Sequence, residues 1–187
     1  MNNRRAVILV ADDDSGDRLL IQGAFQKISP ESCIHVTEDG DGVIAYLAGA
    51  GQYADRHKYP FPTFIITDLK MPRVDGFALL EKVKANPAWS TIPVVVFSAS
   101  CDAEDVRTAY LLGASSYHVK PCGYANLSHF VRVLYEYWMN CELPRIEVNG
   151  TRVRTHRHGT IGSRYPRFDR VGNEKIPGRV DGEEHSK

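Results

Sequence analysis

Five polar side chains stand at the ends of four short apolar runs in this sequence. In chain order they are Asp12 and Asp13, Asp68, Ser98, and Lys120. If the runs are parallel strands, their carboxyl ends meet at one edge of a sheet, where open α/β sheets bind ligands. One pocket would then hold three carboxylates, a hydroxyl and an ammonium. Such a pocket suits a divalent metal and a phosphoryl group.

The three carboxylates are candidate Mg²⁺ ligands, because Mg²⁺ prefers oxygen donors and is held by one or two carboxylates plus phosphate oxygens. Packed together without a cation, Asp12, Asp13 and Asp68 would repel one another. A carboxylate can also act as a nucleophile and form an aspartyl-phosphate. Lys120 would pair with a phosphoryl oxygen, and Ser98 would donate a hydrogen bond to another. Each of these two alone is an ordinary surface residue; together at matching strand ends they favour a site.

The elements that must position these side chains follow a βα repeat, in which short apolar runs alternate with amphipathic segments. The central runs are apolar almost throughout, as expected when helices cover both faces of a sheet. Asp14 and Asp102 are predicted helix N-caps, and Asn86 before a proline ends a helix. The pattern predicts one doubly wound α/β domain. Expected strands span 6–11, 33–38, 63–68, 92–98 and 115–119, and expected helices 15–28, 40–49, 76–86, 103–112 and 124–141.

The composition restricts the class of protein further. The chain has 187 residues, enough for one domain with an appendage, and 43% of them are hydrophobic, as in ordinary globular proteins. No apolar run approaches the roughly 20 residues of a membrane span, and the N-terminus resembles neither a signal nor a transit peptide. The four cysteines have no CxxC spacing, which argues against a zinc site or disulfides. We therefore expect a cytoplasmic protein with reduced thiols and no membrane contact.

The C-terminal part differs in charge from the rest. Residues 1–141 carry 13 Lys and Arg against 16 Asp and Glu, whereas residues 142–187 carry 10 against 7. Alternation around Asn-Gly predicts a hairpin over 146–153, and the remainder of this basic C-terminal extension is expected to be mostly disordered. The expected helix 124–141 has an unusually wide apolar face. Either the domain or the tail covers this face, or it is a surface for a partner or for a homodimer.

Four segments together are similar to a known family. Residues 7–14, 65–76, 93–99 and 113–121 resemble, in order and spacing, the receiver domain of two-component response regulators, over roughly 6–141. The resemblance implies a five-stranded parallel sheet in the flavodoxin-like order 2-1-3-4-5, forming a receiver domain over 1–141. It implies a signalling phosphoprotein that catalyses only its own phosphorylation and dephosphorylation.

The resemblance also implies roles for the pocket residues. Asp68 would be the phosphoacceptor, with Asp12 and Asp13 as Mg²⁺ ligands and the backbone carbonyl of Lys70 as a further ligand. A sensor histidine kinase would donate the phosphoryl group. The Lys70 side chain is a departure from the usual neutral residue; it either pairs with the acidic pocket or points to solvent.

Switching would depend on three further residues. Ser98 matches the hydroxyl that follows the phosphoryl group, and Tyr117 matches the aromatic ring that moves with it. Lys120 matches the phosphate-pairing lysine. The bond between Lys120 and Pro121 is expected to be cis. The changed surface would be read by a downstream protein, a histidine phosphotransfer protein or a second copy. The loop 51–55 and the ending 137–144 resemble single-domain regulators of phytochrome-type histidine kinases.

Two other functions compete with this one. Asp12-Asp13-Asp14 superficially offers the DxD element of an aspartate-nucleophile phosphatase, but Gly16 stands where that motif needs Thr or Val. Alternatively, a phosphorylation-independent adaptor or nucleic-acid-binding module could act through the basic tail, whose arginines are interleaved with Tyr165 and Phe168. A solvated tail is the favoured interpretation of these residues.

Overall fold

The computed structural model describes residues 5–144 of the chain. The hairpin expected over 146–153 and the extension from residue 145 onward lie outside the described residues. Within the described part no helix is both long enough and apolar enough to cross a membrane.

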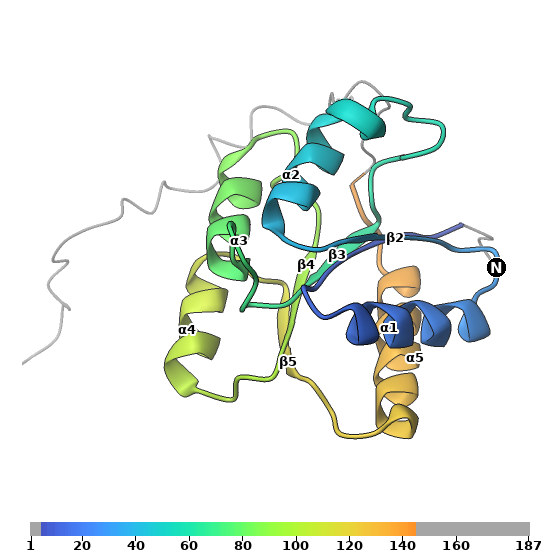
Figure 1. Cartoon of the computed structure of the whole chain (residues 1–187), viewed down its shortest axis with the longest axis vertical. Helices are drawn as coiled ribbons and strands as arrows, with labels where there is room; N and C mark the ends of the chain where they lie inside the picture. Colours follow the sequence, from blue (N-terminus) through green and yellow to red (C-terminus); the bar gives the residue numbers. More distant parts are fainter. Residues whose placement is uncertain (1–4, 145–187) are drawn as a thin grey trace, which may run out of the picture. The chain divides into compact units, whose positions relative to one another are not determined.

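Five parallel strands form a single sheet (Figure 1). Their order is β2-β1-β3-β4-β5, which confirms the expected fold class and strand order. Of the neighbouring pairs in this sheet, β1 and β3 alone are not consecutive in the chain, and each connection between two successive parallel strands runs through a helix. The strands β1, β3 and β4 are almost wholly buried. The bounds are β1 Val7–Ala11, β2 Cys33–Thr37, β3 Phe64–Thr67, β4 Val94–Ser98 and β5 Ser116–Val119.

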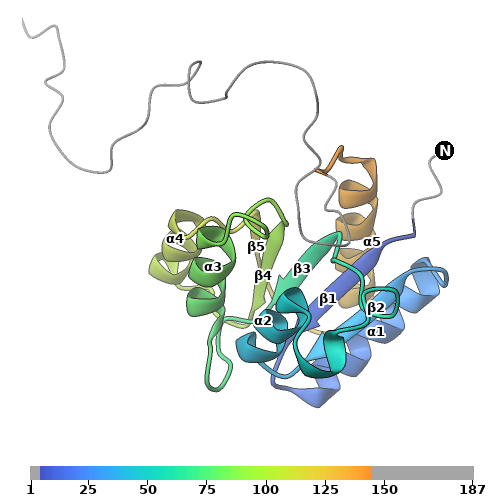
Figure 2. The same cartoon turned by 90° about the horizontal axis from the view of Figure 1, so that it is seen from above.

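Helices cover both faces of the sheet and form two cores (Figure 2). On one face α1 and α5 pack around residues such as Ile8 and Phe64, and on the other α2, α3 and α4 pack around residues such as Leu9 and Ile65. Alternate residues of each strand therefore enter opposite cores. The helices are α1 Ser15–Ile28, α2 Gly40–Ala48, α3 Gly76–Ala85, α4 Ala103–Leu111 and α5 Tyr124–Asn140, with a short 3₁₀ helix η1 Gly51–Tyr53.

Side-chain caps set where the helices begin. The Asp14 carboxylate accepts a hydrogen bond from the backbone N–H of Asp17 at 2.9 Å, and Asp102 accepts from Glu104 at 2.8 Å. Both carboxylates stabilise a helix N-terminus, as expected from the sequence. Asn86 ends α3 in an extended conformation, because the following proline disfavours helix.

Two features concern the surface beside β5. The wide apolar face of α5 is only partly covered: Leu134 and Trp138 are buried, whereas Val133 and Tyr137 are 51% and 60% exposed. The strand β5 has a neighbour on one side alone, and on its open side the hydroxyl oxygen of Tyr110 from α4 accepts a hydrogen bond from a β5 backbone N–H at 3.3 Å.

Candidate functional site

The predicted polar residues converge at the carboxyl end of the sheet. Asp12 follows β1 and Asp68 follows β3, and the Asp68 N–H donates to the Ala11 carbonyl at 2.9 Å. This backbone bond keeps the two strand ends side by side. Oxygen atoms of Asp12, Asp13 and Asp68 all lie within 4.8 Å of one another. The expected grouping of these three carboxylates is thus present in the structure.

Lys120 connects this group to a fourth carboxylate. Its Nζ donates hydrogen bonds to Oδ2 of Asp12, of Asp17 and of Asp68, each at 2.8 Å. The Lys120 backbone N–H donates to the Ser98 carbonyl at 2.8 Å, which fixes where the lysine leaves the sheet. The Lys120 ammonium therefore lies at the centre of the acidic pocket.

Sequence reasoning missed one member of this pocket, Asp17. It lies in the first turn of α1, yet its carboxylate reaches Lys120, 103 residues away in sequence. The signal that was available is its place in a helix that begins directly at the carboxyl edge of the sheet. A carboxylate in such a first turn lies close to the strand-end residues.

The electrostatics of the pocket are dominated by burial and by Lys120. Burial raises the pKa of Asp12, and its hydrogen bond from Lys120 offsets part of that increase. Burial would lower the pKa of Lys120, but its hydrogen bonds to Asp12, Asp17 and Asp68 outweigh burial, and the pKa is raised. Lys120 is therefore a permanent cation near neutral pH, and a second cation would be stabilised by the remaining negative charge.

Asp68 is held by the backbone that follows it. Its Oδ1 accepts hydrogen bonds from the N–H groups of Leu69 at 2.5 Å and Lys70 at 3.3 Å, and its Oδ2 faces Lys120. Asp68 is 8% exposed, so it is buried but still reaches solvent. The Lys70 side chain is exposed and makes no ion pair with any residue in the described part.

The loop after Asp68 is attached to α2. Arg73 adopts a left-handed conformation with φ of 63°, uncommon for a residue with a side chain, and its guanidinium forms an ion pair with Asp39. The Gly40 N–H donates to the Val74 carbonyl at 3.0 Å. Neither contact was predicted from the sequence. Together they fix the loop that carries Lys70.

Ser98 and Tyr117 bind the same loop after β4. The Ser98 hydroxyl is buried and accepts a hydrogen bond from the Ser100 N–H at 3.4 Å, and the Tyr117 hydroxyl donates to the Ser100 carbonyl at 2.9 Å. Burial raises the pKa of Tyr117. The two residues are thereby linked through Ser100, although the Ser98 hydroxyl makes no hydrogen bond to Asp68 in the structure.

The peptide bond between Lys120 and Pro121 is trans, because the described residues contain no cis peptide bond. The expectation of a cis bond is therefore wrong for this structure. The trans form is the one favoured for most X-Pro bonds.

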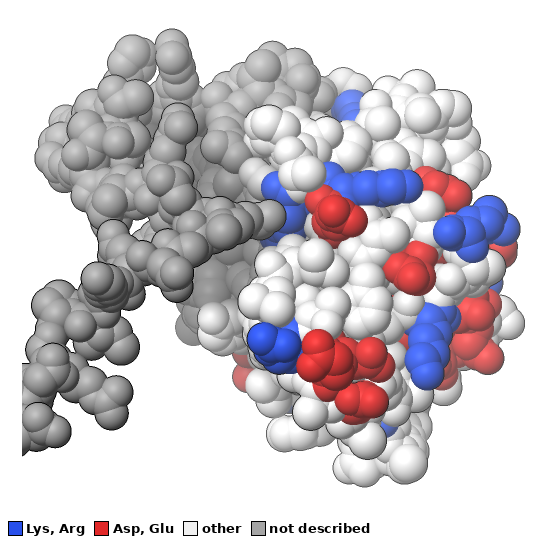
Figure 3. Space-filling model, turned by 90° about the vertical axis from the view of Figure 1, so that its left-hand side faces the viewer, with Lys and Arg blue, Asp and Glu red and all other residues white. Residues whose placement is uncertain are grey.

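The donor set fits a hard divalent cation. It consists entirely of carboxylate oxygens, and Asp13 is exposed, so coordinated water could complete the shell. A cavity of about 200 Å³ is lined in part by Asp17, Lys120 and Tyr124. Unlike the acidic pocket, the face formed by α3 and α4 carries acidic and basic side chains next to one another (Figure 3). Their charges therefore do not add up to an electrostatic potential of one sign.

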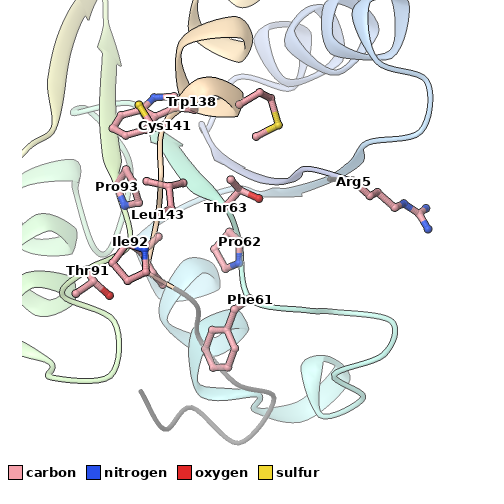
Figure 4. Close-up of a pocket in the computed structure, with 12 residues that line it drawn as sticks. Arg5, Phe61, Pro62, Thr63, Thr91, Ile92, Pro93, Trp138, Cys141 and Leu143 are labelled. Atoms are coloured by element: carbon pink, nitrogen blue, oxygen red, sulfur yellow. The ribbon is translucent and has the colours of Figure 1, made fainter. Parts of the chain in front are cut away.

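A larger cavity, of about 350 Å³, lies at the opposite end of the sheet (Figure 4). Its wall is formed mainly by apolar and uncharged residues from the starts of β3 and β4 and from the end of α5. Among the described residues that line it, Arg5 alone is charged, and in Figure 4 its side chain points away from the others. This cavity therefore offers none of the chemistry of the acidic pocket.

Comparisons with known proteins agree with this geometry. A family model described as the response regulator receiver domain matches residues 8–132. The chain is 31% identical to the probable methanogenesis regulatory protein FilR2 of Methanothrix harundinacea, over 71% of this chain and 83% of that protein. It is 30% identical to the response regulator Rcp1 of Synechocystis, over 74% of this chain and 92% of that protein.

Solved structures show the same similarity. The phosphorylated cyanobacterial phytochrome response regulator RcpA superposes with a TM-score of 0.70 at 30% identity, over 76% of this chain and all of that one. The Mn²⁺-bound form of Rcp1 superposes with a TM-score of 0.67 at 30% identity, over 75% of this chain and 99% of that one. The chain therefore belongs to the response regulator receiver domain family of two-component systems.

Proposed function

We propose that this protein accepts a phosphoryl group on Asp68 in a Mg²⁺-dependent reaction and thereby switches a protein-interaction surface. The observation that carries the proposal is the acidic pocket itself, in which Lys120 bonds to Asp12 and Asp68 while Asp13 lies within 4.8 Å of both carboxylates. A buried carboxylate beside a fixed ammonium and a cation site has the parts that phosphoryl transfer needs.

The chemistry follows from these positions. A carboxylate oxygen of Asp68 attacks the phosphorus atom, and the bond between phosphorus and the donor's nitrogen or oxygen breaks, so the leaving group keeps the electron pair. Mg²⁺, when bound by Asp12, Asp13 and the Lys70 carbonyl, supplies neutralisation of charge on the phosphoryl oxygens. Lys120 pairs with one of these oxygens as Asp68 becomes phosphorylated.

Switching would then proceed through Ser98 and Tyr117. The phosphoryl group adds nearly two negative charges and new acceptor oxygens beside Ser98. If the Ser98 hydroxyl turns to donate to one of them, the Ser100 N–H loses its acceptor, and the loop that also holds Tyr117 is free to move. Phosphorylation would bias an existing equilibrium between two packings of α4, β5 and α5.

We propose a sensor histidine kinase as donor, and a phytochrome-type kinase as its class, because RcpA is a phytochrome response regulator. The output surface would be read by a downstream protein, a histidine phosphotransfer protein or a second copy bound through α5 and the tail. The protein would act in the cytoplasm and catalyse only its own phosphorylation and dephosphorylation. Residues 1–141 would form the receiver, and 142–187 a basic extension.

The decisive experiment is intact mass spectrometry after incubation with a small phosphodonor and Mg²⁺. We expect one added phosphoryl group on the native chain, none after chelation of the metal, and none on Asp68→Asn. The matched control is Asp41→Asn, which removes an acidic residue from the first turn of α2 and should phosphorylate normally. A folded, Mg²⁺-binding chain that gains no mass would overturn the proposal and favour a phosphorylation-independent adaptor.

A further inference from the structure

Asp17 contacts the pocket in a way that the proposed phosphoryl transfer does not use. Its Oδ2 lies 2.8 Å from Lys120 Nζ, the same distance as the oxygens of Asp12 and Asp68. Unlike those two residues, it is outside the carboxylate group that could hold a metal ion. It comes from α1 rather than from a strand end, and its side chain is 38% exposed. It therefore contacts the pocket only through the ammonium.

The hydrogen bonds of Lys120 leave no donor unused. An ammonium carries three N–H donors, and three carboxylate oxygens surround this one. Phosphorylation would change the acceptor at Asp68 alone, leaving Asp12 and Asp17 as they are. Two bonds would then hold the ammonium while the third changes partner.

We infer that Asp17 is a positioning residue that, together with Asp12, fixes the Lys120 ammonium so that its third N–H faces the phosphoryl group on Asp68. This inference rests on the proposed phosphorylation of Asp68. Lysine has a flexible four-carbon stem, and the 200 Å³ cavity beside Lys120 gives that stem room to move. Asp17 also lines this cavity, and its hydrogen bond holds the ammonium close to the acidic pocket.

The alternative account of Asp17 is purely electrostatic: its negative charge would repel an anionic phosphodonor. The two accounts differ for asparagine, whose amide oxygen still accepts a hydrogen bond from an ammonium but carries no charge. Asp17→Asn preserves positioning and removes the charge. Asp17→Ala and the near-isosteric Asp17→Leu remove both.

The test measures the initial phosphorylation rate of the full chain over a range of small-phosphodonor concentrations at saturating Mg²⁺. We expect Asp17→Ala and Asp17→Leu to lower the maximal rate about 10-fold, since small misplacements of a reacting group carry large penalties. Asp17→Asn should stay within about 2-fold of the native rate, because it retains the acceptor. The half-saturating donor concentration and the Mg²⁺ affinity, measured by calorimetry, should not change.

The matched control is Asp41→Ala, which removes an acidic residue from the first turn of another helix without contacting Lys120. Native rates in Asp17→Ala and Asp17→Leu would overturn the inference. The inference would also be overturned if Asp17→Ala and Asp17→Asn had equal effects that were confined to the half-saturating donor concentration. A weakened Mg²⁺ affinity in all the Asp17 variants would overturn it too. Failure of the proposed function is distinguishable, since the native chain itself would then gain no phosphoryl group.

Discussion

The two ends of the sheet each hold a half-buried lysine, and the two lysines have opposite environments. At the carboxyl end Lys120 bonds to three carboxylates, which raise its pKa against the effect of burial. At the amino end Lys84 donates to the carbonyls of Ser90 and Ile92, and burial lowers its pKa. The first lysine is part of a concentrated charge distribution, and the second satisfies backbone acceptors.

This difference shows that charge, rather than cavity size, distinguishes the end at which we propose phosphorylation. The cavity at the amino end is the larger of the two, at about 350 Å³ against about 200 Å³. The described residues that form its walls are mainly apolar or uncharged and include no carboxylate. Chemistry at the carboxyl end depends on strand ends that bring side chains of opposite charge to one place.

The largest effect on the phosphorylation rate should be seen when each of these two lysines is replaced by methionine in a separate variant. Lys120→Met should slow phosphorylation of Asp68 about 100-fold, because a fixed cation facing the phosphoryl oxygens is lost. Lys84→Met should leave the rate unchanged, since Lys84 bonds only to carbonyls at the other end. Mass spectrometry over time measures both rates. Equal losses in the two variants would contradict the comparison.

Metal binding at the carboxyl end of the sheet should stabilise the folded protein strongly. Mg²⁺ at 100 times its dissociation constant should raise the free energy of unfolding by about 2.7 kcal/mol, by mass action. Asp13→Asn should reduce this increment at the same Mg²⁺ concentration, because an exposed ligand is lost while the fold is kept. Denaturant titrations with Mg²⁺ and with chelator provide the measurement; identical curves for the native chain would refute a metal site.

Shortening a side chain at the amino end of the sheet should lower the stability of the protein without changing its phosphorylation rate. Leu143→Ala enlarges the 350 Å³ cavity, and because Leu143 is only half-buried the free energy of unfolding should fall by about 1 kcal/mol. Phosphorylation should remain within about 2-fold of native, since the cavity shares no residue with the acidic pocket. A large loss of phosphorylation in a folded variant would mean that the two ends are coupled.

The smallest effect concerns pH and the histidine of β2. His35 packs between the rings of Tyr46 and Tyr59, and burial lowers its pKa. The unfolded chain therefore binds the proton more readily, so the contribution of His35 to stability is present above its unfolded pKa and is lost as pH falls. His35→Phe should flatten the acid side of the stability profile. Denaturant titrations of the native chain and of His35→Phe from pH 7 to 5 provide the measurement, and identical profiles would contradict this contribution of His35.

Much of the site could be predicted from the sequence, because strand-end placement depends on local pattern. Alternating apolar runs locate each strand, and in a parallel sheet the residue after each run lies at a common edge. Asp12, Asp68 and Lys120 were found in this way, and the helix caps at Asp14 and Asp102 follow from nearest-neighbour chemistry.

Contacts that depend on how elements pack could not be predicted. Which way Asp17 faces is decided by the rotation of α1 against α5, and pairing with Lys120 depends on that packing. The ion pair between Arg73 and Asp39 likewise joins a loop and a helix that no sequence period relates. The expectation of a cis bond before Pro121 came from family resemblance and not from a local signal.

The hydroxyl of Tyr110 has a consequence for how the protein avoids aggregation. An edge strand with free backbone N–H groups is a template on which a strand of another molecule can add. Here Tyr110 already occupies the N–H of Tyr117 in the middle of β5. An incoming strand would have to displace the Tyr110 hydroxyl before it could bond to this N–H. The tyrosine thus disfavours growth of the sheet into a larger, intermolecular one.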